Sequence, residues 1–371
     1  MLATEVITDA AGLDALREEW DALVVAAGLP MAAPAWALAW LRHLAPRDAQ
    51  ARVIAVRDGD TLVGLAPLFL SSDGGAAAYA TLGERFLWRV VPLADPGRSW
   101  EVTHAMFSAL RSLDPEPDIL RFRSASSGEW YGPWHLAHMA TPEQRAPIVR
   151  NGDLSSCPFV AIDGTFERWF AARSSNFRSE MRRLRRRFEE AGGTIRASDP
   201  ASYEADLATY IRLHMSRWDG RETGFAPFAD VLPRMLLEVA QALPQERVKL
   251  YLTELDGAAI GAQLFTSAGP VLSYHNGGWD ERHSRLKPGL LGVCHALEQA
   301  FAAGLERLDF GPGDYSYKLR FASGDDPVLR STFFFPGPRL AGAMASRAPQ
   351  LAGQLGRRVA AQLRARAKPS E

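Results

Sequence analysis

Two nearby stretches of the chain decide the fold: KPGLLG at residues 287–292 and DFGPGDYSYK at residues 309–318. The first predicts a helix start, because proline suits the first helical position and the first backbone amides have no partner within the helix. Such amides form a ready site for an anion, and Lys287 adds a positive charge. The second predicts a short strand that ends in a glycine loop with two tyrosines and a lysine. Together they predict a phosphate-bearing donor on the helix start, with polar side chains beside it.

Composition narrows the class of protein. The chain has 371 residues, 47% hydrophobic and 23% charged, which predicts a globular protein of two domains. A formal net charge of −1 argues against a general DNA-binding protein, since such affinity comes mainly from neutralised phosphates. Two distant cysteines predict a reducing compartment, so we expect a cytoplasmic protein. Residues 22–41 carry no charge, but Gly28, Pro30 and Pro34 divide them, which predicts two helices and no transmembrane segment.

An internal repeat predicts two α/β modules of one plan. Residues 51–70 and 248–267 each predict a β-hairpin around an Asp-Gly turn. A helical segment precedes each hairpin, and a Pro-Gly pair, a helix and a short strand follow it. A chance coincidence of hairpins is the alternative. The expected helices are residues 11–27, 101–112, 201–218 and 289–303, and the expected short strands are residues 119–123 and 307–310.

The repeat sets the predicted domains. We expect a first module at 1–145, a second at 146–340 and an amphipathic helix at 341–371, which is a candidate for peripheral membrane contact. Asp95 occupies in the first module the place of Lys287 in the second, and an acid there repels phosphate. Only the second module is therefore expected to bind an anionic donor. The first serves as scaffold and as one wall of a cleft between the modules.

The segment joining the modules also carries a pattern. Residues 140–158 predict a linker, because they are rich in Pro, Gly, Ser and charge. Residues 173–190 predict an amphipathic helix with seven arginines and three glutamates. One interpretation of this charge is a solvated surface. The other is a basic patch, including Arg178 and Arg182, that recognises an anionic substrate such as a nucleotide-linked sugar or a lipid phosphate. The apolar stripe of this helix is Phe177, Met181, Leu184 and Phe188.

The order of these elements, with the PGLLG helix start and the DFGPGDYSYK loop, resembles the GNAT superfamily. It looks most like the CelD/BcsL-type (BioF-like) acetyltransferases, relatives of the Fem-type aminoacyl transferases, over about residues 1–340. The resemblance implies an α/β fold of two tandem GNAT-like modules, each a mixed, mostly antiparallel sheet flanked by helices. It also implies an acyl-CoA donor, acetyl-CoA first of all, and an amine acceptor. The usual pyrophosphate loop is matched only approximately, which leaves open aminoacyl-tRNA, the donor of Fem-type relatives.

Acyl transfer from a thioester to an amine needs a neutral nucleophile, a stabilised oxyanion and a proton for the departing thiolate. Under the resemblance, backbone amides of residues 273–276, which include Tyr274 and Asn276, polarise the carbonyl. Lys318 stabilises the oxyanion or a phosphate. The expected donor-phosphate residues are Lys287, Gly289, Leu290, Leu291 and Gly292. The expected proton carriers are Tyr315 and Tyr317 for the leaving group and Asp314 and His275 for the amine. His214 and Trp218 are expected to line the acceptor pocket.

Each of these residues also has a purely structural interpretation. Asp314 can cap a turn, Lys318 can be a surface charge, and the tyrosines and Trp218 can simply pack. Competing motifs are weaker. The glycines at 311 and 313 lack the third glycine of a dinucleotide site, and His135 with His138 has no third metal ligand nearby, so we expect no metal.

Three functions are compatible with these patterns. The leading one is an N-acyltransferase that uses acetyl-CoA or another acyl-CoA and acts on a small-molecule or sugar amine, such as an amino sugar in polysaccharide or envelope metabolism. The second is a Fem-like aminoacyl transferase that docks tRNA on the basic helix. The third is a catalytically silent GNAT-like module that senses or scaffolds in a polysaccharide assembly complex.

Overall fold

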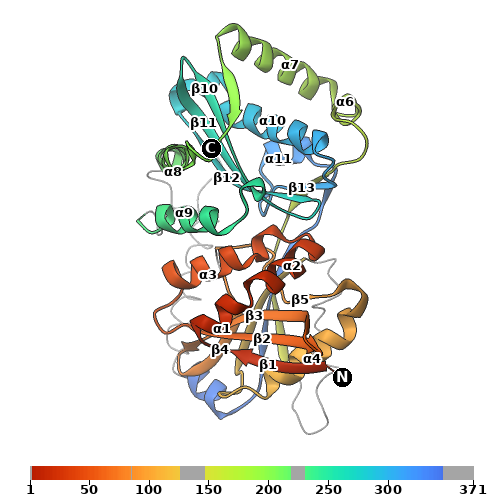
Figure 1. The fold of residues 1–371 in the computed structure, drawn as a ribbon, viewed down its shortest axis with the longest axis vertical. Coiled ribbons are helices and arrows are strands. Elements are labelled where there is room, and N and C mark those ends of the chain that lie inside the picture. Colours follow the sequence, from red (N-terminus) through yellow and green to blue (C-terminus); the bar gives the residue numbers. More distant parts are fainter. Residues whose placement is uncertain (1, 85, 126–146, 219–229, 346–371) are drawn as a thin grey trace, which may run out of the picture.

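The structure is a computed structural model that describes residues 2–84, 86–125, 147–218 and 230–345. Two mixed sheets lie one above the other along the longest axis, each flanked by helices (Figure 1). The first sheet contains β1 (Leu2–Ile7), β2 (Gln50–Asp58), β3 (Thr61–Asp73), β4 (Ala76–Thr81), β5 (Leu93–Ala94), β6 (Ile119–Ala125), β7 (Ile148–Ser155) and β15 (Val328–Phe334). The second contains β8 (Pro158–Ala161), β9 (Thr194–Ala197), β10 (Val248–Leu255), β11 (Ala258–Ala268), β12 (Val271–Trp279), β13 (Arg307–Asp309) and β14 (Gly324–Asp325).

Helices cover both sheets. The α-helices of the first module are α1 (Ala10–Ala15), α2 (Arg17–Ala27), α3 (Pro34–His43) and α4 (Ser99–Arg111). Those of the second are α6 (Phe166–Ala171), α7 (Ser175–Glu190), α8 (Tyr203–Trp218), α9 (Leu232–Ala242), α10 (Pro288–Ala302) and α11 (Ser316–Phe321). Within the described residues, the 3-10 helices are η1 (Pro30–Ala32), η2 (Pro96–Arg98), η4 (Gln245–Arg247) and η5 (Glu281–Leu286).

The predicted repeat is present in both sheets. The strand order is β1-β2-β3-β4-β6-β15-β7 in the first sheet, with β5 on β3, and β9-β10-β11-β12-β13-β8-β14 in the second. In each sheet an antiparallel hairpin and third strand are followed by a parallel pair, β4 with β6 and β12 with β13. Asp256 and Gly257 turn the second hairpin with φ of 51° and 74°. The fold class of two mixed, mostly antiparallel sheets is therefore confirmed.

The first sheet is completed by strands from beyond residue 146. The predicted linker at 140–158 is wrong for residues 148–155, because they form β7, which pairs with β15. Strand β15 comes after the second sheet in sequence and lies between β6 and β7. Its Phe333 is fully buried and meets the ring of Phe122 at 6.0 Å. The two sheets thus do not separate at the predicted boundary of residues 145 and 146.

A continuous apolar core joins the two modules. It includes Trp20 and Trp36 of the first module and Tyr210 and Met235 of the second. The uncharged segment 22–41 forms α2, η1 and α3, as predicted, and its lack of charge reflects burial in this core. Within the described ranges, no helix has the length and apolarity that a bilayer crossing needs. Residues 338–345 are helical, and the rest of the helix expected at 341–371 lies outside the described residues.

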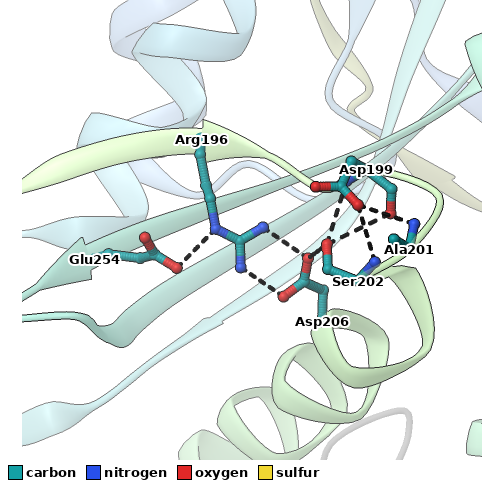
Figure 2. Close-up of polar contacts among 6 residues, drawn as sticks. All are labelled: Arg196, Asp199, Ala201, Ser202, Asp206 and Glu254. Carbon is teal, nitrogen blue, oxygen red and sulfur yellow. Dashed lines mark hydrogen bonds and ion pairs between the residues drawn. The ribbon is translucent and has the colours of Figure 1, made fainter.

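A polar cluster fixes the start of α8, the helix that packs against β11 and β12 (Figure 2). Arg196 of β9 donates to both carboxylate oxygens of Asp206, at 2.7 Å each, and to Glu254 of β10 at 2.8 Å. Asp199 accepts from the backbone amides of Ala201 and Ser202 at 2.9 Å. Bidentate pairing of this kind fixes both angle and distance, so the cluster sets where α8 enters the fold.

We expect Phe333→Ala to destabilise the first module although residue 333 follows all the strands of the second sheet in sequence. Removing this buried ring leaves a cavity and should lower the free energy of unfolding by about 3–5 kcal/mol. Urea unfolding measures the change, and Met344→Ala, at a 55% exposed side chain, is the control. An equal, small effect of both substitutions would show that β15 is not part of the first core.

Candidate active site

The site is built where β12 and β13 separate. These parallel strands pair over three residues, and the last pair is Ser273 with Asp309. Beyond Ser273, β12 continues to pair with β11 on its other side, while the chain after Asp309 turns toward β8. In the described part of the chain, no strand pairs with the freed edge of β12. The backbone of residues 274–276 therefore borders a wedge between two strands. The role of its amides in polarising a carbonyl stays a prediction.

His275 lies at an irregularity of β12 and is enclosed by the first module. The register with β11 shifts there, since Tyr274 pairs with Phe265 and Asn276 with Leu264. The imidazole is 4.8 Å from the ring of Trp36 and 6.0 Å from that of Trp88, with which it stacks. Burial, and to a smaller extent His214, lowers the pKa of His275 to about 3. The ring is therefore neutral at pH 7.

Lys318 is buried beneath the glycine loop. Its ammonium donates to the carbonyl oxygens of Pro312 at 2.8 Å and Gly311 at 3.2 Å, which fixes the charge just beyond the end of β13. An ammonium has three donors, and the described residues accept two of them. Burial lowers the pKa of Lys318 to about 8. Only 5% of Lys318 is exposed, so the surface-charge interpretation is wrong.

The loop above Lys318 presents its polar side chains outward. The Tyr315 ring lies 5.3 Å from the Lys318 ammonium and stacks on Tyr317 at 6.3 Å. Tyr315 is 53% exposed, and Asp314 is exposed as well. The structure thus places the Tyr315 ring, with Tyr317 stacked on it, beside one buried cation, while the Asp314 side chain is exposed to solvent.

A segment of the first module closes one side of the site. Trp88 packs on Gly311, where an added Cβ would lie 2.9 Å from the indole. The neighbouring Arg89, buried and with φ of 56°, donates to the backbone and carboxylate of Asp326, at 2.9 Å each. The same guanidinium is 3.8 Å from Asp309, which also accepts from Arg307 at 2.7 Å. This ion cluster attaches the first module to the end of β13.

The start of α10 carries a positive charge that is already paired. Lys287 occupies the left-handed region, with φ of 50°, and its ammonium is 2.5 Å from Glu180 of α7. The other oxygen of Glu180 pairs with Arg320 of α11. Both cations lower the pKa of the Glu180 carboxyl, and the hydrogen bond from Lys287 has the largest effect. The backbone amides of Leu290 and Leu291 donate to the Lys287 carbonyl at 3.0 and 3.1 Å.

Close packing explains why the start of α10 has two glycines. An added Cβ at Gly289 would lie 2.8 Å from the ring of Trp279, and one at Gly292 would overlap the side-chain amide of Gln263. Gln263 is fully buried, and its amide atoms have no hydrogen bond with the described protein groups. The absence of a side chain at both positions therefore lets α10 approach the sheet. A role in phosphate binding stays a prediction.

The other predicted site residues do not all lie at the wedge. His214 of α8 is buried, and its Nδ1 lies 3.3 Å from the Gly277 carbonyl oxygen behind β12. Tyr274 is buried against Phe265, and the Asn276 side chain accepts from the Gly277 amide at 2.9 Å. Trp218 ends α8, but its side chain lies outside what the structure describes. Arg178 and Arg182 line a groove between α6, α7 and α10, apart from the wedge.

Sequence reasoning missed Glu180, Arg320, Trp88 and Arg89. The sequence carried weak signals for the first two. Glu180 is a glutamate within a run of arginines, and Arg320 follows Lys318 by two residues. The described residues hold no cluster of three or more side chains suited to a metal ion, and His135 with His138 lies outside them. The expectation of no metal thus stays a prediction.

Comparison with known proteins locates the family likeness. Residues 175–319, which include the wedge, Lys287 and Lys318, match the family model described as an acetyltransferase (GNAT) domain. No curated protein matches the chain. The CelD/BcsL subtype stays an expectation.

Solved structures share the fold at low sequence identity. The structure of FemX is 12% identical, with a TM-score of 0.62 over 90% of this chain and 97% of that one. A conserved protein of unknown function from Bacteroides thetaiotaomicron is 12% identical, with a TM-score of 0.58 over 90% and 100%. L-PGS from Bacillus licheniformis is 12% identical, with a TM-score of 0.53 over 91% and 96%. These likenesses concern the fold.

We expect Lys318→Met to remove a pH dependence of stability. The native pKa of Lys318 is about 8, below the value of about 10.4 in an unfolded chain. Between these values the unfolded state binds more protons, so this residue makes the free energy of unfolding rise with pH. Urea unfolding across that range should show a smaller rise in the variant than in the wild type. Lys249→Met is the control, and equal slopes for all three proteins would contradict a depressed pKa.

Proposed function

We propose that the chain is a GNAT-type N-acyltransferase that moves an acyl group, in the simplest case acetyl, from acyl-CoA to an amine. The observation that carries this proposal is the wedge between β12 and β13 with the Lys318 ammonium fixed at its end. Both lie within the part of the chain that matches a GNAT domain. An amino sugar of polysaccharide or envelope metabolism is the proposed acceptor, on the sequence resemblance alone.

The reaction forms a C–N bond and breaks a C–S bond, and acyl-CoA supplies the activated thioester. Backbone amides at residues 274–276 would polarise the carbonyl, and the third N–H of Lys318 would stabilise the negative charge that develops on its oxygen. We assign protonation of the departing sulfur to Tyr315, because its ring is exposed beside Lys318. A pKa of about 3 makes His275 a weak base, so we assign proton acceptance from the amine to Asp314 through water.

The start of α10 fits the donor phosphates in charge but holds a competitor. Lys287 and Arg320 converge from two elements, and the helix start favours a negative group. Glu180 now accepts from both cations, so a diphosphate would have to displace this carboxylate from them. We therefore propose Lys287 and Arg320 as the phosphate-binding side chains and Glu180 as the group that weakens their affinity.

Two alternatives have specific support. The shared fold with FemX and the seven arginines of residues 173–190 favour an aminoacyl transferase that docks tRNA on α7. The pairing of Glu180 with Lys287 favours a silent module, since both charges are satisfied without a ligand.

Calorimetry with acetyl-CoA, longer acyl-CoAs and bulk tRNA separates these functions. We expect micromolar acyl-CoA binding that Lys287→Ala weakens and Glu180→Gln strengthens, each about tenfold, because the first removes a phosphate partner and the second its competitor. Glu189→Gln, the same change at an exposed position of α7, is the control.

The other outcomes are equally defined. Binding of tRNA that is lost when the arginines of residues 178–187 are replaced supports the aminoacyl transferase. No binding of any donor, also in Glu180→Gln, contradicts both enzymes and supports the silent module.

We expect Lys318→Ala to lower turnover about a hundredfold or more while leaving acyl-CoA affinity within about threefold, because its charge acts on the oxygen of the reacting carbonyl. Release of CoA thiol across a panel of amino sugars and amino acids measures turnover, and calorimetry measures affinity. Lys249→Ala is the control. Unchanged turnover in Lys318→Ala would remove this residue from the mechanism.

A further inference from the structure

A second concave site lies between α6, α7 and α10, on the side of the second module where these helices gather (Figure 1). Its volume is about 550 Å³, within the range of small-molecule sites. The buried side chains of Met181 and Cys294 contribute apolar surface, and Phe166 and Phe170 of α6 line it as well. The groove therefore offers an apolar surface between the three helices.

Three arginines of α7 border this apolar surface. Arg178, Arg182 and Arg185 are spaced four and three residues apart, which places them on one face of the helix. Arg185 pairs with Glu298 of α10 at 2.7 Å. Arg178 donates to the carbonyl oxygens of Ala171 and Arg173, at 2.8 and 2.5 Å. Arg185 is thus neutralised by its partner, whereas Arg178 is held in place by backbone carbonyl groups that do not neutralise its charge.

Arg182 differs from both neighbours. Its guanidinium lies over the ring of Phe170 at 5.7 Å, and none of the described residues gives it a hydrogen bond or an ion pair. Because the guanidinium stacks on the ring through its flat face, the N–H donors along its edge remain available for a planar or tetrahedral anion. With Arg185 and Glu298 paired, the lining retains two arginines against one acid, Glu167. The charge of the rim therefore favours an anion.

We propose that this groove binds an amphiphile through its phosphate head group and one alkyl chain. The alkyl chain lies on the apolar surface beside Met181, and the phosphate accepts from Arg182 and Arg178. A polyanion such as tRNA would use charge alone and leave the apolar surface in water, so the combination favours an amphiphile. The residues of the groove take no part in the acyl transfer proposed above, so this site is tested separately.

The test uses the full chain and three probes below their micelle-forming concentrations: octyl phosphate, octyl glucoside and inorganic phosphate. Calorimetry should show one site for octyl phosphate and binding at least about tenfold weaker for the other two, because each lacks half of the required chemistry. Arg182→Gln should weaken octyl phosphate about tenfold. Arg183→Gln, the same charge change on an exposed neighbour outside the groove, should leave the affinity unchanged.

Ala171→Trp supplies a variant that keeps every charge. Ala171 is exposed at the rim, so an indole there should fill the mouth and weaken octyl phosphate without changing the core. Vesicles of phosphatidylcholine with and without phosphatidylglycerol identify the source of the ligand. Vesicle binding lost in Arg182→Gln indicates a membrane lipid, and octyl phosphate binding without vesicle binding indicates a free amphiphile; both support the proposal.

Three results would overturn this proposal. Inorganic phosphate that binds as tightly as octyl phosphate would remove the role of the apolar surface. Equal losses in Arg182→Gln and Arg183→Gln would indicate a diffuse charge effect of α7. The third result is displacement of octyl phosphate by tRNA, together with an equal loss of tRNA affinity in Arg182→Gln and Arg183→Gln. It would identify α7 as a surface that binds polyanions.

Discussion

The site depends on the ion cluster that Arg89 forms with Asp309 and Asp326. Asp309 is the last residue at which β13 pairs with β12, so the cluster holds the strand end from which the wedge opens. Arg89 is buried, and its left-handed backbone is unusual for a residue with a side chain. A buried charge without its partner costs about 3–5 kcal/mol. The first module is therefore bound to the place where the second module has its chemistry.

This attachment explains why the two modules have different roles on a common plan. Both sheets have a parallel pair of three residues, but in the first sheet β6 continues along β15, whereas in the second the chain leaves the sheet after Asp309. The His275 ring of this part of β12 is then enclosed by aromatic rings of the first module, and Lys318 lies under the loop that follows β13. One module thus supplies the wedge and its cation, and the other supplies the wall around His275.

Much of the fold could be predicted because it follows from local sequence. The Asp-Gly hairpins, the proline at the start of α10 and the apolar stripe of α7 each depend on residues within a few positions of one another. The contacts that complete the site do not. Glu180 and Lys287 are 107 positions apart, and Arg89 meets Asp326 across 237 positions. A single sequence does not show which distant residues form such pairs. The glycines that suggested a phosphate loop are explained in part by Trp279 and Gln263 beneath them.

The position of β15 has a consequence for biosynthesis. Strand β6 cannot pair with β15 until the ribosome has passed residue 334, because β15 is made after all the strands of the second sheet. A nascent chain that has finished its first 125 residues therefore exposes an open strand edge with unsatisfied backbone groups. Domains usually fold in order as they emerge, but here the earlier half closes last. Termination before β15 is complete would release a protein whose first half is the incomplete one.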